Sequence, residues 1–378
     1  MIVLNKRPDF LFSDQSSDLS MDEFDMAVHY IDRIKSILDL QEQVLSEQKA
    51  DPKIVLPDNN WSKSKGQAFE LDGTITNMYT SFDLIMRKDF DIIKKLRLYA
   101  QGFSGYQLAT WSPAYCRPWI REKLPENIDF FIKMLVGLPD ESVHSYLKFV
   151  AKAPKKLLLS PPAKFGEIGW VIDDVIVNMD TVVYLERMCL MHENNVLDAA
   201  LSSAKGRPVK ILEIGGGYGG LAYNLVRQFG NCRYVMVDLP ESVLFPAIYL
   251  SVLKPDLENS MIDRFEPFTL DESAGFTFVP NFLIDQLHVG DEKFDLVINT
   301  LSFSEMSELQ IDHYGKLVSS LLSETGIFFE QNQGSKINGT DKTLLESIFS
   351  KYFSKMTYGN SKILDSIHAQ GQPRIWEL

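Results

Sequence analysis

The residues best suited to chemistry lie in the stretch VKILEIGGGYGGLA, residues 209–222. Its apolar run predicts a strand, and the glycines after it predict a turn at which a ligand can lie directly against the backbone. Two patterns overlap here: the dinucleotide pattern G-x-G-x-x-G at Gly215, Gly217 and Gly220, and the pattern E-x-G-x-G-x-G at Glu213, Gly215, Gly217 and Gly219. Spacing alone leaves both kinds of nucleotide cofactor open.

Two carboxylates bear on that choice. Glu213, two places before the first glycine, would face the crevice, where it repels a diphosphate and attracts an ammonium group. Asp238 ends the run YVMVD, 23 residues after Gly215, where a carboxylate can accept both hydroxyls of a ribose. NAD uses the same device, so only Glu213 discriminates. It favours S-adenosylmethionine, which carries an ammonium and a sulfonium.

The elements that must position these residues follow from the hydrophobic pattern. The first 200 residues are mostly helical, with helices predicted over 21–48, 81–101, 126–150 and 180–204 and an irregular connector, SPPAKFGEIGW. From residue 206, the apolar runs VKILEI, RYVMVD, FDLVINT and TGIFFEQ have strand length and alternate with helical stretches. FTFVPNFL is a candidate for a further strand, and RIWEL is a candidate final edge strand. This alternation predicts an α/β fold, a Rossmann-like doubly wound parallel sheet. We therefore expect a mainly helical region over 1–205, serving substrate binding or oligomerisation, and a cofactor-binding domain over 206–378.

Composition excludes several classes of protein. The chain has 378 residues and a net charge of −13, which argues against binding to nucleic acid or to anionic membrane. No run of 18 apolar residues and no secretory signal is present, and the three cysteines are far apart, so we expect a cytoplasmic protein.

The same survey predicts no metal site. No H-x-x-x-H or C-x-x-C spacing occurs, and no paired aspartates follow the strand FDLVINT. The acidic pair Asp173 and Asp174 lies upstream and is interpreted as a solvated turn.

Three stretches, ILEIGGGYGG, YVMVDLPE and FDLVINTLSFSEM, resemble class I S-adenosylmethionine-dependent methyltransferases. More narrowly, SFSEM and the upstream KFGEIGWVIDDVIVNMDTVVYLERM resemble the sugar O-methyltransferase family found among bacterial polysaccharide and secondary-metabolite genes. The resemblance runs from about residue 160 to 335. It implies a seven-stranded methyltransferase core that transfers a methyl group to a hydroxyl of a sugar or sugar-containing small molecule.

The resemblance also assigns cofactor contacts. It implies that Glu213 and the three glycines of the second pattern line the methionine part of the cofactor. Asp238 would hold the ribose, Leu239 would lie against the adenine, and Asn299 would lie under the reacting centre. Asn281, in the candidate strand FTFVPNFL, would contact the adenine.

Methyl transfer to a hydroxyl requires positioning and a proton acceptor. Glu305, in SFSEM, is the candidate base, or alternatively caps the next helix; His368 is a second candidate, or a solvated loop residue. Four further side chains each have a binding and a packing interpretation. Glu330 and Asn332 either bind the substrate or hydrogen-bond within their own loop. Trp170 either stacks on a sugar ring or packs in a core. Tyr218 either closes over the cofactor or packs against the N-terminal region.

The expected partner is a small-molecule acceptor, with a homodimer possible. Two other classes of function remain open. The core could methylate nitrogen or carbon of a non-sugar metabolite, or use the sulfonium cofactor for other alkyl chemistry. A nicotinamide-dependent oxidoreductase would need its catalytic domain entirely upstream of the glycines. A non-catalytic scaffold is disfavoured, because a retired site has no need of Glu213, the glycines and Asp238.

Overall fold

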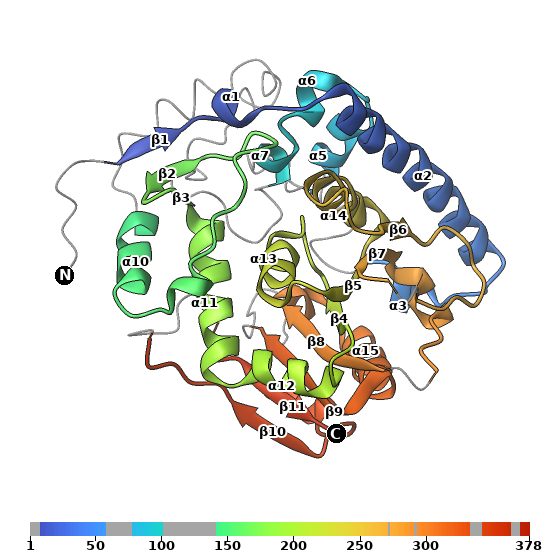
Figure 1. Cartoon of the computed structure of the whole chain (residues 1–378). Helices are drawn as coiled ribbons and strands as arrows, with labels where there is room; N and C mark the ends of the chain where they lie inside the picture. The colour runs from blue at the N-terminus through green and yellow to red at the C-terminus, as the bar shows by residue number, and fades with distance from the viewer. Residues whose placement is uncertain are drawn as a thin grey trace. The chain divides into compact units, whose positions relative to one another are not determined.

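A computed structural model of the chain describes residues 8–57, 78–100, 141–270, 273–290, 293–332, 342–363 and 371–378. The chain divides into two compact units, Met1–Ile31 with Lys63–Cys189, and Asp32–Ser62 with Leu190–Leu378. The second unit, which contains the large sheet, thus includes two segments, 32–62 and 190–205, that precede the predicted domain boundary. Two of the boundaries between these ranges fall within helices, at 31/32 in α2 (Met21–Ser46) and at 189/190 in α11 (Met179–Glu193). Figure 1 labels both helices.

The first unit is built from short elements. In chain order they are β1 (Asp9–Leu11), α1 (Ser13–Ser16), α5 (Met78–Ile85), α6 (Phe90–Ile93), α7 (Leu96–Ala100), α10 (Glu141–Val150), the 3-10 turn η3 (Lys155–Leu157), β2 (Gly169–Ile172) and β3 (Val175–Val177). The helix predicted over 21–48 is confirmed as α2, whereas the helix predicted over 81–101 is broken into α5, α6 and α7. The break follows Lys88, whose backbone is left-handed (φ 56°), and Asp89, whose carboxylate caps α6 by accepting from the N–H groups of Asp91 and Ile92.

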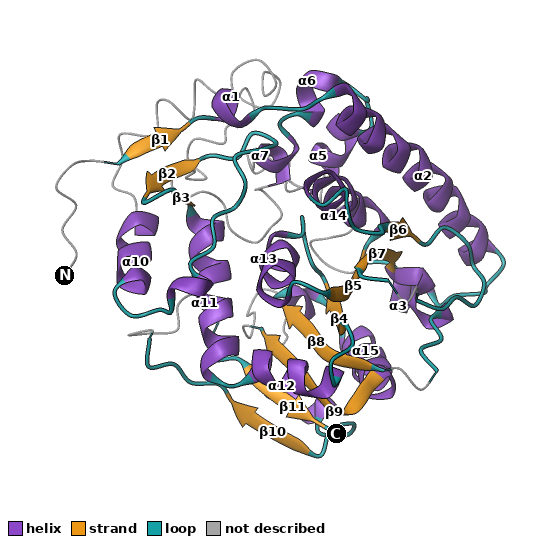
Figure 2. Ribbon diagram, viewed as in Figure 1, coloured by secondary structure: helices purple, strands orange, loops and turns teal. Residues whose placement is uncertain are grey.

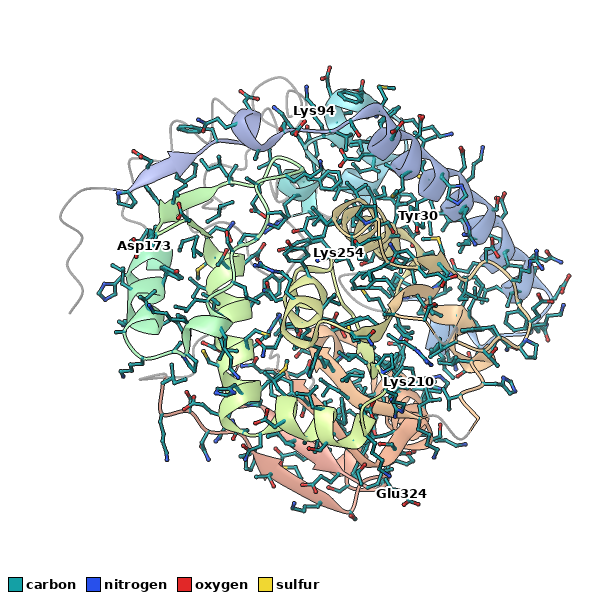
Figure 3. All side chains as sticks on the ribbon, viewed as in Figure 1. Tyr30, Lys94, Asp173, Lys210, Lys254 and Glu324 are labelled. Atoms are coloured by element: carbon teal, nitrogen blue, oxygen red, sulfur yellow. The ribbon has the colours of Figure 1, made fainter. Side chains whose placement is uncertain are left out.

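A three-stranded antiparallel sheet, ordered β1-β2-β3, was not predicted because its strands are only three or four residues long. Strands β2 and β3 form a hairpin through Asp173 and Asp174, both exposed and both at positive φ (48° and 64°), as a two-residue hairpin turn requires. Figure 3 labels Asp173 in this turn. The interpretation of this acidic pair as a solvated turn is confirmed. Strand β1 adds to the hairpin with Phe10 opposite Trp170.

The second unit alternates strands and helices, as predicted. Its elements are α3 (Pro52–Val55), α12 (Val196–Ala204), β4 (Val209–Ile214), α13 (Gly220–Phe229), β5 (Cys232–Asp238), α14 (Pro240–Leu253), β6 (Ser260–Met261), β7 (Gly275–Pro280), η4 (Asn281–Gln286), β8 (Phe294–Thr300), η5 (Ser302–Glu305), α15 (Glu308–Leu321), β9 (Leu322–Gln331), α16 (Lys342–Phe349), β10 (Lys355–Tyr358) and β11 (Arg374–Glu377). The helix predicted over 180–204 is two helices, α11 and α12, because Asn195 between them is left-handed (φ 59°).

Local sequence explains where the helices of this unit begin and end. Pro240 occupies the first turn of α14, where its missing N–H costs nothing. Helix α15 begins with a capping box, in which the Ser307 side chain accepts from the Gln310 N–H and the Gln310 side chain accepts from the Ser307 N–H. Helix α13 ends at Gly230, whose positive φ (74°) suits a glycine.

The eight-stranded sheet has the order β10-β11-β9-β8-β4-β5-β7-β6 (Figure 2). All neighbouring pairs are parallel except those of β11, which runs antiparallel to both β9 and β10. RIWEL is therefore a strand but not an edge strand. The edge is β10, which was missed because the mostly exposed KMTY carries little apolar pattern.

Strand order reverses between β4 and β8, because β4 leads to β5 and β7 on one side and β8 leads to β9 on the other. Right-handed crossovers in opposite directions put helices α13 and α14 on one face of the sheet and α15 on the other. Strands β4 and β8 are buried along their whole length, as expected of strands covered on both faces. The α/β prediction of a Rossmann-like, doubly wound seven-stranded core is confirmed, with the two-residue β6 added at its edge. In the described residues, no helix has the length and apolarity needed to cross a membrane.

Candidate cofactor site

The predicted cofactor residues meet at one edge of the sheet. Strand pairing places Ile214 beside both Val237 and Asn299, and Asp238 beside Pro280. The residues that follow these strand ends therefore lie next to one another at the switch point of the sheet, where doubly wound folds bind their ligands.

Most glycines of the 215–219 loop are required by contacts within the protein. A Cβ on Gly215 (φ +74°) would lie 2.3 Å from the Oγ of Ser302, and one on Gly216 would lie 2.3 Å from the Cε of Met236. A Cβ on Gly219 (φ +92°) would lie 2.9 Å from a methyl of Leu250 on α14. Close packing of the loop on its neighbours thus accounts for three of the glycines.

Gly217 differs from its neighbours. Its φ is +57°, and no described atom lies within 4 Å of the position that a Cβ would take. Its N–H donates to the Oδ2 of Asp238 at 3.3 Å. Gly217 is therefore the place in the loop where a ligand can approach the backbone without displacing described protein atoms.

This contrast predicts unequal effects of alanine at the two positions. Gly217→Ala meets only the cost of a left-handed alanine, about 1–2 kcal/mol of unfolding free energy. Gly219→Ala adds a collision with Leu250 and is expected to cost about 1–3 kcal/mol more, as an overpacked side chain does. Urea unfolding of the two variants measures the difference; equal losses would contradict the open space assigned to Gly217.

Asp238 is half-buried at the end of β5. Its carboxylate accepts the N–H of Leu239 at 2.8 Å and that of Gly217 at 3.3 Å. Burial nevertheless outweighs these bonds and raises the pKa of Asp238 to about 6. Leu239, also half-buried, follows it as the residue before α14.

Glu213 lies below the glycine loop and is 1% exposed. Its Oε2 accepts the hydroxyl of Tyr234 at 2.9 Å and would lie 3.0 Å from a Cβ on Gly216. A carboxylate is thus fixed directly beneath the backbone of the loop, and it makes this part of the site unfavourable for a second anion.

Asn281 follows β7 and is 9% exposed. Its Nδ2 donates to the backbone carbonyl of Val55 on α3 at 2.7 Å. Its Oδ1 has no hydrogen-bond partner within the described chain. An unsatisfied buried acceptor costs about 1–3 kcal/mol, and such groups in a native structure call for an explanation.

Asn299, at the end of β8, is fully buried and bonded within the protein. Its Nδ2 donates to the carbonyl of Ile214 at 2.9 Å and to the Oγ of Ser302 at 2.6 Å, and its Oδ1 accepts from the Nδ2 of Asn332 at 2.9 Å. The amide ties the ends of β4, β8 and β9 together. The predicted contact of Asn299 with a cofactor stays a prediction.

Glu330 and Asn332 lie on the same polar network. Glu330 is 0% exposed and forms an ion pair with Arg374 of β11. The Nδ2 of Asn332 donates to the Oε2 of Glu330 at 2.8 Å as well as to Asn299. These contacts agree with the interpretation in which Glu330 and Asn332 form hydrogen bonds within the protein. That either residue binds a substrate stays a prediction.

The remaining candidates lie in different places. Glu305 is half-buried and ends η5, which follows Leu301, a non-glycine residue at φ 72°. Tyr218 is buried edge-to-face against Tyr249 of α14, with ring centroids 5.2 Å apart. Trp170 belongs to the first unit, where it is buried edge-to-face against Phe10. His368 lies outside the described residues.

Sequence reasoning missed two residues next to the site. Gln310 of α15 donates from its Nε2 to the carbonyls of Ile54 (3.0 Å) and Leu56 (2.9 Å), and the capping-box pattern S-x-x-Q was its visible signal. Leu301 carried no signal, because leucine rarely adopts a positive φ; strained backbone of this kind gathers at functional sites. No group of three or more potential metal ligands occurs among the His, Cys, Asp and Glu residues of the described ranges.

Neither a protein-family model nor a curated protein matches this chain. Similar solved structures include magnesium protoporphyrin IX methyltransferase from Synechocystis with bound SAM (11% identity over 52% of this chain and 80% of that chain, TM-score 0.33). They also include spermidine synthase from Thermotoga maritima (15% identity over 50% of this chain and 59% of that chain, TM-score 0.32). A third is WbdD (19% identity over 50% of this chain and 39% of that chain, TM-score 0.35). The chain spans three fifths or less of the last two. Similarities this distant do not identify the cofactor or the reaction. The function is therefore inferred from the chain's own residues.

Proposed function

We propose that this chain binds S-adenosylmethionine and transfers a methyl group to a small-molecule acceptor. The observation that carries the proposal is the buried carboxylate of Glu213 beneath the glycine loop. A dinucleotide would bring its diphosphate to this loop, against that charge. A ligand with an ammonium group gains from it.

Two further features support the fit of this cofactor. Asp238 offers carboxylate oxygens at the end of β5, suited to a ribose diol. The Oδ1 of Asn281, without a described partner, is an acceptor suited to the exocyclic amine of adenine. When bound, the cofactor supplies a methyl group on a sulfonium, and the chain's residues hold the ligand and exclude alternatives.

We further propose that the acceptor atom is the hydroxyl oxygen of a sugar or sugar-containing molecule. The resemblance of SFSEM to the sugar O-methyltransferase family supports this choice. Glu305 would take the hydroxyl proton, because η5 holds it just beyond the end of β8 and close in sequence to the strained Leu301. Methylation of nitrogen or carbon is the alternative that a panel of acceptors would separate.

The cofactor proposal is tested by calorimetric titration with S-adenosylhomocysteine and, separately, with NADH. Binding of the sulfur cofactor alone, at micromolar dissociation constant or tighter, is expected. Binding of NADH alone would overturn the proposal and assign the glycines to the G-x-G-x-x-G pattern at Gly215, Gly217 and Gly220, with Asp238 on a ribose of the dinucleotide.

The proposed base is tested by Glu305→Gln, once an acceptor is found. Removing a general base is expected to lower kcat about 10²–10⁴-fold with S-adenosylhomocysteine affinity unchanged. Glu308→Gln, at the exposed start of α15, is the matched control and should leave kcat near the original value. Full turnover in Glu305→Gln would assign Glu305 to its other interpretation, a helix-capping residue.

A further inference from the structure

A short upstream segment reaches the adenine side of the proposed site. Residues 52–56, comprising α3 and Leu56 and here called the strap, belong to the same compact unit as the sheet. The strap packs on α15, and Val55 is buried. It lies more than 220 positions before Asn281, so no local sequence pattern links the two.

Gln310 fastens the strap at two points. Its Nε2 donates to the carbonyls of Ile54 and Leu56, on either side of Val55. Its Oε1 accepts the N–H of Ser307 at 2.9 Å, so the amide is held at both ends. The carbonyl of Val55 between these points is thereby fixed in direction.

That carbonyl sets the orientation of Asn281. Because a carbonyl only accepts, the amide must turn its Nδ2 toward Val55. The Oδ1 of Asn281 has no hydrogen-bond partner among the described residues. The bond to Val55 thereby leaves Oδ1 as an acceptor with a fixed direction.

We infer that the strap and Gln310 make Asn281 a selector for a 6-aminopurine over a 6-oxopurine. An amine donates to Oδ1, whereas the oxygen of a 6-oxopurine would face it lone pair to lone pair. A freely turning asparagine could serve either base by rotating its amide, so selection requires the fastening. This inference rests on the proposed cofactor and concerns positioning residues, Gln310 and the strap.

The test compares the dissociation constants of S-adenosylhomocysteine and its deaminated form, S-inosylhomocysteine, by calorimetry. The original protein is expected to favour the adenine form about 100-fold, since a site built to accept from an amine leaves its acceptor unpaired with the analogue. Gln310→Glu keeps the Oε acceptor for Ser307 but turns an oxygen toward both strap carbonyls. The preference should then fall below about 10-fold.

Ser307→Ala is the matched control, because it removes the hydroxyl that bonds to the N–H and the Oε1 of Gln310 but keeps the Ser307 N–H bond to that Oε1 and both bonds of Gln310 to the strap. It should keep the full preference. A merely structural role for Gln310 would weaken both ligands equally and leave their ratio unchanged, which would overturn the inference. If Gln310→Glu does not fold, the two dissociation constants of the unsubstituted protein still test the inference. Equal affinity for the two ligands overturns the inference alone. Binding of neither ligand overturns the proposed cofactor as well.

Discussion

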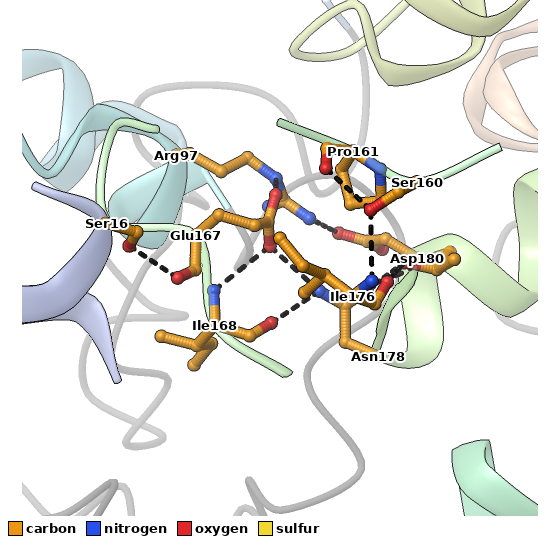
Figure 4. A network of polar contacts seen from close by, with 10 residues as sticks. Ser16, Arg97, Ser160, Pro161, Glu167, Ile168, Ile176, Asn178 and Asp180 are labelled. Atoms are coloured by element: carbon orange, nitrogen blue, oxygen red, sulfur yellow. Dashed lines mark hydrogen bonds and ion pairs between the residues drawn. The ribbon is translucent and has the colours of Figure 1, made fainter. Parts of the chain in front are cut away.

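Replacing Arg97 with alanine is expected to lower the free energy of unfolding by about 3–5 kcal/mol, because it takes the guanidinium charge away from two buried carboxylates. Arg97 is 1% exposed and lies between Glu167 (Nε to Oε2, 2.7 Å) and Asp180 (Nη2 to Oδ2, 2.5 Å). The Nδ2 of Asn178 donates to Glu167 at 2.8 Å, and the N–H of Ile168 does so at 3.2 Å (Figure 4). These neutral donors cannot replace the guanidinium charge.

The loss of unfolding free energy in Arg97→Ala should increase as pH rises. Burial raises the pKa of Glu167 to about 7 even with Arg97 present. A carboxyl whose pKa is raised on folding contributes stability that is complete below pH 4.5 and is lost as pH rises through about 7. Without Arg97 the ionised form is less favoured still, so the deficit of Arg97→Ala should grow between pH 5 and pH 8.

Urea unfolding at several pH values checks this result. Arg87→Ala, which removes an exposed arginine of the same unit, is the control and should change the unfolding free energy by less than about 0.5 kcal/mol. Adding Glu167→Gln to Arg97→Ala should recover part of the loss, because it removes one stranded charge. A change of under about 1 kcal/mol in Arg97→Ala would mean that the cluster is hydrated rather than buried.

The second large effect is expected at Asp238. Asp238→Ala should weaken binding of S-adenosylhomocysteine about 100-fold, since hydrogen bonds to a charged group contribute about 1.5–3 kcal/mol each. The carboxylate also accepts the N–H groups of Leu239 and Gly217, so its loss also loosens the loop. Calorimetry measures the affinity, and circular dichroism checks that the variant is folded. Unchanged affinity in a folded variant would remove Asp238 from the site.

Protonation should reproduce part of that loss. Because burial raises the pKa of Asp238 to about 6, the ligand-binding carboxylate is present above pH 6 and disappears below it. Affinity should therefore be flat from pH 8 to pH 7 and then decline by up to about 10-fold per pH unit below pH 6. Asp238→Asn, which does not titrate, should bind more weakly but with a flatter profile over this range.

Local sequence pattern predicts much of the large sheet. Strands β4, β5 and β8 are mainly apolar along their length because both faces are covered, and such a run is visible in the sequence. The glycines after β4 and the acid that ends β5 occupy places that the topology fixes, so the sequence alone locates them. The polar β10 and the two-residue β6 were missed, because neither forms an apolar run.

What escaped prediction depends on non-local contacts. Lys88 and Asn195 break long helical patterns through left-handed backbone, for which neither residue type is diagnostic. The partners of Glu330 and Asn299 come from other strands, so a side chain that the sequence offers to a ligand is occupied within the protein. The contact of Asn281 with Val55 joins segments that only the fold brings together.

The assignment of residues 32–62 to the unit that carries the sheet limits how this chain can be recombined. A chimera that took residues 206–378 onto another N-terminal half would keep the glycine loop and Asp238 but would leave the strap behind. Asn281 would then lose the Val55 carbonyl that orients it. A transfer that preserves the site must therefore carry residues 52–56 together with residues 206–378, two stretches that are far apart in the sequence.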